Sequence, residues 1–252
     1  MSATSWQGVS VAELERASHT AVPAQRTAFD GPFLLRAFLG GTGRANAASS
    51  LDPSPDANLP LRLARIEAAY RRAGLSPRFR STPLDPPELE QALLDRGYRA
   101  DEGSRVMAGP LGQFAAADPA VDVLEGPENA FLSVLSTAEY QSVARRTEKQ
   151  QAAAMMMVPA AWLVLREDGQ PAACAQVAVD GRLVGFFDIA VRPEFRRRGL
   201  ARRIIAASAA WGQERGGTTG WLQVSAGNLA ASALYEALGL REIYRYRYFL
   251  PG

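Results

Sequence analysis

The chain has 252 residues, 47% of them hydrophobic, and a formal net charge of +2, as expected for a globular protein with one large or two small domains. The balanced charge, without a long basic face or an RNA-binding signature, argues against nucleic acid as a partner, and without a long apolar run or an export signal we expect neither membrane insertion nor secretion. A single cysteine excludes an intrachain disulfide and fits a reducing cytoplasm. One cysteine and one histidine are too few for a zinc site of the usual ligand type, so we expect no metal.

Residues 10–50 are predicted to form one helix and two strands. Ser10-x-x-Glu13 is a capping-box pattern at the start of an amphipathic helix that continues to His19. Residues 33–39 and 44–50 have the composition of strands. The Gly-Gly-Thr-Gly sequence between them favours a hairpin.

Residues 61–119 continue the alternation of helix and strand. Helical spacing of apolar residues predicts helices at 61–72 and 88–96, which end at Gly74 and Gly97. Short extended segments are predicted at 78–82 and 98–107. Residues 109–119, rich in Gly, Pro and Ala, have the composition of a linker.

The next segment is predicted to contain two helices and three strands. Residues 127–135 and 138–155 have helical patterns, and residues 162–166 and 171–179 form a predicted hairpin through Glu-Asp-Gly-Gln. Cys174 lies in this hairpin, and because His19 is far away in the sequence we expect a buried structural thiol and not a nucleophile. Residues 183–191 form the central strand.

Residues 191–203 join that strand to a predicted helix at 200–213, as a strand-to-helix elbow. Gly199 has no side chain and Ala201 almost none, so another molecule can approach the backbone there. The free N–H groups of the first helical turn and the positive end of the helix dipole attract phosphate. Five arginines surround the elbow: Arg196, Arg197, Arg198, Arg202 and Arg203. The alternative is an ordinary solvated, basic start of a helix.

A second motif follows about 25 residues later. A strand at 220–224 precedes a predicted helix that begins near Asn228 and ends at Gly239, and an aromatic strand follows at 243–249. Asn228 and Tyr235 are seven residues apart, about two helical turns, so they share one face. Without further context, Asn228 is an N-cap and Tyr235 a core aromatic.

Together the two motifs resemble the signatures of the GNAT (Gcn5-related N-acetyltransferase) superfamily. Arg196-x-x-Gly199-x-Ala201 is similar to the Arg/Gln-x-x-Gly-x-Gly/Ala loop that holds the pyrophosphate of coenzyme A. The helix with Asn228 and Tyr235 is similar to the one whose Asn contacts the pantetheine arm and whose Tyr lies near the thioester sulfur. The resemblance implies an α+β fold with a mixed, mostly antiparallel sheet flanked by helices.

The resemblance also implies a set of residues that bind acetyl-CoA, partly through backbone atoms of the central strand. These are Ile189, Ala190, Val191, Arg196, Arg197, Arg198, Gly199, Leu200, Ala201, Arg202 and Asn228.

The order of elements repeats when the sequence is shifted by 142 residues. The matched pairs are Gly74 with Gly216, Phe79 with Trp221, Gly97 with Gly239 and Arg99 with Arg241. Residues 44–49 fall on 186–191 of the central strand. The repeat indicates two related units in tandem.

The first copy lacks the functional positions of the second. Opposite Arg196, Gly199, Ala201, Asn228 and Tyr235 stand Ser54, Ala57, Leu59, Pro86 and Leu93. We therefore predict a degenerate GNAT-like domain at 1–112, a linker at 113–120 and an acetyltransferase domain at 121–252.

The resemblance predicts an acetyl-CoA-dependent N-acetyltransferase that transfers the acetyl group directly to an amine in a ternary complex. Tyr235 is the expected proton donor to the departing thiolate. Asp188 on the central strand is the first candidate for the base, and Glu148 and Glu139 are its rivals. The acceptor, a small molecule or a peptide with an amine, stays open, as does a homodimer. The competing hypothesis is a non-catalytic module that binds acyl-CoA or a partner protein.

Overall fold

The computed structural model describes residues 8–138 and 141–252. Its helices are α1 (Val11–Ala21), α2 (Leu59–Arg72), α3 (Leu89–Asp95), α4 (Asn129–Leu135), α5 (Val143–Ala153), α6 (Leu200–Gln213) and α7 (Leu229–Ala237). Three short 3-10 helices are η1 (Gly43–Ala45), η2 (Leu111–Gln113) and η3 (Pro193–Phe195). Among the described residues, no helix has the length and apolar character needed to cross a bilayer.

The strands of the first half are β1 (Arg26–Asp30), β2 (Phe33–Ala37), β3 (Ala48–Ser50), β4 (Phe79–Ser81), β5 (Tyr98–Ala100) and β6 (Ser104–Pro110). Those of the second half are β7 (Val121–Leu124), β8 (Ala160–Glu167), β9 (Gln170–Asp180), β10 (Leu183–Val191), β11 (Thr219–Ser225) and β12 (Arg241–Pro251). The result is the predicted α+β fold, a mixed sheet flanked by helices.

Local sequence signals with a clear physical basis are confirmed. Ser10 caps α1, and Glu13 closes the capping box by accepting the Ser10 N–H. The β8–β9 hairpin turns through Asp168 and Gly169, both with positive φ, as a type I′ turn requires. Helix α6 occupies the predicted residues 200–213.

Other predicted elements are wrong in extent. The predicted strand at 44–50 begins as η1, and only its last three residues form β3. Strands β1 and β7 were not predicted. The predicted linker at 109–119 begins inside β6, where a side chain on Gly109 would meet the Gly239 carbonyl oxygen at 2.7 Å. Gly109 therefore allows the chain to pack closely there. From composition alone, the same glycine suggested a flexible linker.

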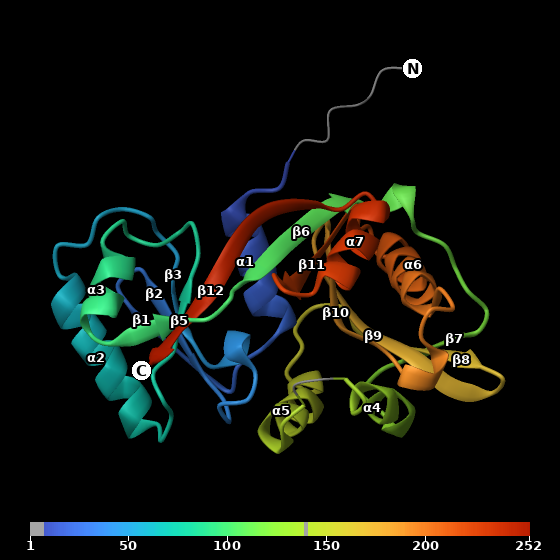
Figure 1. Ribbon diagram of the computed structural model, residues 1–252, viewed down its shortest axis with the longest axis horizontal. Helices are drawn as coiled ribbons and strands as arrows, with labels where there is room; N and C mark the ends of the chain where they lie inside the picture. Colours follow the sequence, from blue (N-terminus) through green and yellow to red (C-terminus); the bar gives the residue numbers. More distant parts are fainter. Residues whose placement is uncertain (1–7, 139–140) are drawn as a thin grey trace.

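One continuous sheet runs through both halves in the order β1-β2-β3-β4-β12-β6-β11-β10-β9-β8-β7, with β5 beside β12. Strand β6 lies between β12 and β11. Strand β12 pairs with β6 over residues 241–246 and then with β4 and β5 over 247–251. Figure 1 shows β6 and β12 bridging the two lobes. Each half thus contributes a strand to the sheet of the other, and the division at residues 113–120 stays a prediction.

Equivalent elements occupy equivalent places in the two halves. The pairs β3–β4 and β10–β11 are parallel, whereas their neighbours in the sheet are antiparallel. Gly74 and Gly216 have positive φ after α2 and α6, and Gly97 and Gly239 have positive φ after α3 and α7. The 142-residue repeat therefore corresponds to a repeated arrangement of strands and helices.

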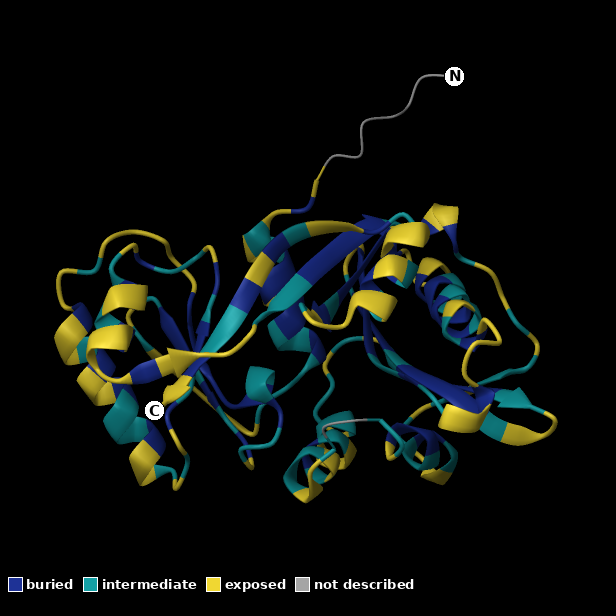
Figure 2. Cartoon of the chain, viewed as in Figure 1, coloured by how far each residue is buried: buried dark blue, intermediate teal, exposed yellow. Residues whose placement is uncertain are grey.

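Helices cover both faces of the second half's sheet. Helix α6 and Tyr235 of α7 pack with the core on one face, and α4 packs through Phe131 and Val134 on the other. Helix α1 lies on that second face, where Leu14 joins a cluster with Phe187 and Trp221. Figure 2 shows the buried strands between helices whose outer surfaces are exposed. Helix α1 of the first half therefore completes the core of the second.

A buried ion pair fixes α1 to the bridging strands. The Glu15 carboxylate accepts hydrogen bonds from Arg80 of β4 and from the Tyr244 hydroxyl of β12. Both charged side chains are 1% exposed. The Arg80 guanidinium also lies 3.8 Å from the centre of the Tyr246 ring. This network ties α1 to the place where β12 passes from one half to the other.

We expect Glu15→Gln to lower the free energy of unfolding by about 3–5 kcal/mol, because Arg80 would keep a buried charge without its partner. Urea unfolding at pH 7, followed by circular dichroism, measures the change. Arg16→Gln is the control, since the Arg16 side chain is 65% exposed in its ion pair with Asp180 and should contribute less than about 1 kcal/mol. An equal loss of unfolding free energy in the two variants would show that the buried ion pair contributes no more to stability than the exposed one.

Candidate active site

The candidate site lies where β10 and β11 separate. Their parallel pairing covers Leu183–Phe186 and Thr219–Leu222 and then stops. Beyond this point a cavity of about 230 Å³ opens between the strands. Ile189 of β10, Val224 of β11, and Asn228 and Tyr235 at α7 line it. The structure therefore places Asn228 and Tyr235 of the second motif beside Ile189 of the central strand.

A β-bulge shapes the β10 side of the cavity. The register between β10 and β9 shifts between Phe187 and Ala190, and Asp188 has a φ of 52°. Such a bulge bends the strand and increases its twist. Within the described residues, the edge of β10 beyond Phe186 has no pairing with β11, so this edge of Ile189, Ala190 and Val191 faces no strand, and Ile189 lines the cavity. These are the residues predicted to contact pantetheine through main-chain atoms.

Asp188, the first candidate for the base, lines the cavity but forms an ion pair with Lys149 of α5. Its side chain is 5% exposed. Burial alone would raise the pKa of Asp188, but the Lys149 ammonium outweighs it and holds the pKa below its ordinary value. A carboxylate with a lowered pKa takes up a proton poorly, so this geometry weakens its assignment as base, which stays a prediction.

Glu148, a rival candidate, is engaged in anchoring a loop of the first half. Its carboxylate accepts hydrogen bonds at 2.5–2.9 Å from the backbone N–H groups of Leu39, Gly41 and Thr42. It also accepts one at 2.8 Å from the Asn46 side chain. With four donors and 2% exposure, Glu148 is a structural clamp. The third candidate, Glu139, lies outside the described residues.

The elbow after β10 has the predicted bare backbone. Gly199 caps α6 with a φ of 76°, and a side chain built there would meet no atom within 4 Å. Within the described ranges, the first-turn N–H groups of Leu200, Ala201 and Arg202 have no hydrogen-bond acceptor. This end of α6 presents donors and a helix dipole to solvent.

Four of the five arginines of the elbow are exposed, namely Arg196, Arg197, Arg198 and Arg202. The fifth, Arg203, is instead paired with Asp118 at 2.7 Å and Glu167 at 3.2 Å. Arg203, which is not among the residues predicted to bind acetyl-CoA, thus has its side chain engaged by two carboxylates.

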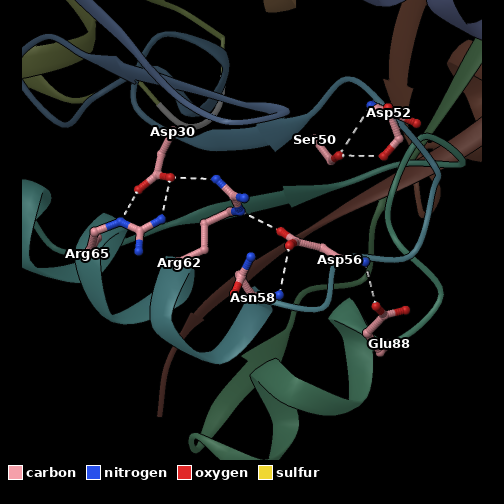
Figure 3. A network of polar contacts seen from close by, with 8 residues as sticks. All are labelled: Asp30, Ser50, Asp52, Asp56, Asn58, Arg62, Arg65 and Glu88. Atoms are coloured by element: carbon pink, nitrogen blue, oxygen red, sulfur yellow. Dashed lines mark hydrogen bonds and ion pairs between the residues drawn. The ribbon is translucent and has the colours of Figure 1, made fainter.

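The corresponding elbow of the first half is filled by its own side chains (Figure 3). Asp56 accepts from the Asn58 N–H at 3.0 Å and pairs with Arg62 of α2. Arg62 in turn contacts Asp30 at 2.5 Å. An internal carboxylate thus stands near the start of α2, where a phosphate would need free donors. The start of α2 therefore offers an anion fewer free donors than the start of α6.

Asn228 and Tyr235 lie on the same face of α7 and line the same cavity, as their spacing predicted. The Asn228 side chain also caps α7 by accepting the Ala231 N–H at 3.1 Å. Tyr235 is 7% exposed, and burial raises its pKa to about 12. Its phenol therefore keeps its proton at neutral pH and can donate it.

Among the cavity residues that the sequence analysis missed are Arg44 of η1, Gln141 just before α5, and Arg145 in the first turn of α5. Arg44 was placed in a strand, and its approach to β10 depends on packing between the halves. A further missed residue is Lys149, the only lysine of the chain. That the sequence contains a single lysine was the one feature that could have drawn attention to this residue.

The sequence of this chain is similar to those of known acetyltransferases. Residues 9–249 match the family described as "Probable histone acetyltransferase Rv0428c C-terminal". Among curated relatives, the [ribosomal protein bS18]-alanine N-acetyltransferase of Salmonella typhimurium is 43% identical over 91 residues, covering 35% of this chain and 60% of that protein. The chain thus spans about 60% of the length of these bS18 relatives. The uncharacterized N-acetyltransferase YobR of Bacillus subtilis is 24% identical over 94% of this chain and 97% of its own.

Solved structures show the same fold. A GCN5-related N-acetyltransferase from Kribbella flavida has a TM-score of 0.69 at 20% identity, with 96% of this chain and 95% of that chain covered. A tandem GNAT protein from the clavulanic acid biosynthesis pathway has a TM-score of 0.64 at 12% identity, with 94% and 86% covered. Both similarities extend over both halves of the chain.

We expect Lys149→Met to lower the free energy of unfolding by about 3–5 kcal/mol at pH 7, because Asp188 would stay buried without its cation. In that variant burial would raise the pKa of Asp188 above its unfolded value, so stability is retained at low pH and lost as the pH rises through the raised pKa. The loss should therefore be smaller at pH 5 than at pH 7 in urea unfolding.

Arg146→Met, an exposed position on the same helix, is the control and should change stability little at either pH. A loss that is the same at pH 5 and pH 7 would contradict the role of the Asp188 charge.

Proposed function

The chain belongs to the family of the Rv0428c C-terminal domain, a family of GNAT acetyltransferases, and on this premise we propose that it is an acetyl-CoA-dependent N-acetyltransferase acting on a primary amine. One observation carries the proposal. The bare elbow at Gly199 and the cavity with Tyr235 lie along the same stretch of β10 and the segment that follows it. One extended donor molecule could therefore place its phosphates at the elbow and its thioester near the proton donor Tyr235.

The elbow fits the pyrophosphate of the acetyl donor. The N–H groups of Leu200, Ala201 and Arg202 would donate to phosphate oxygens, and Gly199 leaves room for them. The exposed guanidinium groups of Arg196 and Arg198 add charge-assisted contacts. The unpaired edge of β10 from Ile189 to Val191 offers main-chain groups to the pantetheine amides, and Asn228 contacts the same arm.

Transfer would proceed directly within a ternary complex. The neutral amine nitrogen attacks the thioester carbonyl carbon, a C–N bond forms and the C–S bond breaks. Tyr235 gives its phenolic proton to the departing sulfur, and the amine proton leaves through a base or a water chain. A backbone N–H of β10 at the bulge would stabilise the negative charge that develops on the carbonyl oxygen.

The first half supports this site as a scaffold. Helix α1 completes the core under β10, and the Glu148 clamp holds the η1 loop against α5 at the cavity. We propose the division into a degenerate GNAT-like unit at 1–112, a connection at 113–120 and a catalytic unit at 121–252. The exchange of β6 and β12 makes these units interdependent.

The amine acceptor of the bS18 relatives is a ribosomal-protein alanine. For this chain we propose the coarser class of a small-molecule or peptide amine, in a cytoplasmic setting where acetyl-CoA is available. A non-catalytic acyl-CoA-binding module is the alternative, because the same fold in the first half has lost its anion site.

We expect Gly199→Glu to abolish binding of coenzyme A in isothermal titration calorimetry, because a carboxylate would occupy the phosphate position. Gly216→Glu is the matched control. Gly216 lies just beyond the other end of the same helix, also with positive φ and open space at Cβ. Both variants carry similar backbone strain, so loss of binding in both, or in neither, would refute the elbow as the phosphate site.

We expect Tyr235→Phe to lower kcat about 100-fold or more, because general acid catalysis typically contributes a factor of this size. Since the pKa of Tyr235 is about 12, the parent should show no alkaline fall in kcat from this group between pH 7 and pH 10. A pH–rate profile with a responsive amine measures both effects.

Tyr98→Phe, which removes a part-buried hydroxyl bonded to Glu67 in the first half, should leave kcat unchanged. Unchanged turnover in Tyr235→Phe would remove the proposed acid. A parent that binds coenzyme A but turns over no amine in a broad panel would favour the binding module.

A further inference from the structure

One wall of the cavity is built jointly by the two halves of the chain. Arg44 comes from η1 in the first half, whereas Gln141 lies just before α5 and Arg145 in its first turn in the second half. All three line the cavity that also holds Tyr235 and Asp188. Two arginines, one from each half, therefore line the same cavity.

Among the described residues, the nearby carboxylates form no ion pair with these arginines, although the Asp188 charge interacts with both over a longer distance. Asp188 is paired with Lys149, and Glu148 is engaged by four N–H donors of the η1 loop. Within the described part of the chain, neither Arg44 nor Arg145 has an ion-pair partner. The charged side chains around the cavity therefore have a net positive charge.

Arg44 is held in place by contacts at both ends. Its backbone carbonyl accepts a hydrogen bond of 2.9 Å from Arg36, and its guanidinium lies 5.1 Å from the centre of the Phe187 ring. The loop before it packs closely on α5, since a side chain on Gly41 would lie 2.5 Å from the Arg145 backbone nitrogen. The position of Arg44 relative to Arg145 is thus set by the clamp and not by a mobile loop.

Two buried polar atoms at this wall have no hydrogen-bond partner among the described residues. They are Oε1 of Gln141 and Nε of Arg145. Buried polar groups are normally paired, so such atoms point to a ligand or to water. One is an acceptor suited to an amine N–H, and the other is a donor suited to an oxyanion.

We propose that the acceptor carries a carboxylate close to its reactive amine, and that Arg44 and Arg145 bind this carboxylate while Gln141 orients the amine. This inference rests on the proposed acetyltransferase function. A cavity of about 230 Å³ is below the usual range for drug-sized ligands, which favours a compact acceptor. Arginine forks match carboxylates in geometry as well as charge.

Two sources would supply this chemistry, a free amino acid and the acidic N-terminal residue of a peptide. Acetylation is therefore measured with amino acids against their primary amides, and with tripeptide amides that begin with Asp or Glu against those that begin with Asn or Gln. In each pair a carboxylate is replaced by a neutral amide of similar shape. Since the amide also lowers the pKa of the α-amine, rates are compared at equal concentrations of the neutral amine. The first comparison tests an α-carboxylate and the second a side-chain carboxylate.

We expect the charged member of one comparison to be favoured at least 10-fold in kcat/KM. Arg145→Gln and Arg44→Gln should each raise KM for the charged acceptor about 10- to 100-fold, as expected for losing a hydrogen bond to a charged group, with little change in kcat. The affinity for coenzyme A should stay unchanged, which also shows that the variants are folded. Arg146→Gln, exposed and outside the cavity, is the control and should match the parent.

The outcomes separate this inference from the proposed function. If the parent binds coenzyme A and acetylates neutral amines as well as their acidic counterparts, the carboxylate site is wrong and the acetyltransferase stands. If KM for acidic acceptors is the same in Arg145→Gln and Arg146→Gln, Arg145 does not bind the acceptor. If coenzyme A does not bind at all, the proposed function itself fails.

Discussion

The exchange of β6 and β12 between the halves is the constraint on which the rest of the structure depends. Strand β6 takes the place beside β11 that closes the second half's sheet, and β12 reaches β4 and β5 of the first. An unpaired edge is a template for aggregation, and the exchange removes one from each half. It also fixes β11, one wall of the cavity, by hydrogen bonds along its whole length to β6.

The clamp at Glu148 adds a second link that acts on the site itself. Since one buried carboxylate collects four donors from a loop of the other half, that loop can move only if several buried groups lose their partners. The first half thus has a role in shaping the cavity. In the proposed function the chemistry belongs to the second half, while the architecture uses both.

The local parts of the site could be predicted from the sequence, and the long-range parts could not. The Gly199 elbow and the shared face of Asn228 and Tyr235 depend on backbone geometry within about ten residues, which spacing reveals. The Lys149–Asp188 pair and the approach of Arg44 to Phe187 depend on packing between distant segments. The role of Gly109 could not be predicted for the same reason. A side chain at this position would collide with the carbonyl of Gly239, which is 130 positions away in the sequence.

The path of β12 also bears on how the chain acquires its structure during synthesis. Strand β4 pairs Ser81 with Arg247, so the first half cannot complete its sheet until nearly all of the described chain has left the ribosome. Contacts between residues so distant in sequence slow folding, and partly folded domains expose strand edges in the meantime. The two halves are therefore expected to reach their native form in one late, concerted step, and neither is expected to fold first as an independent unit.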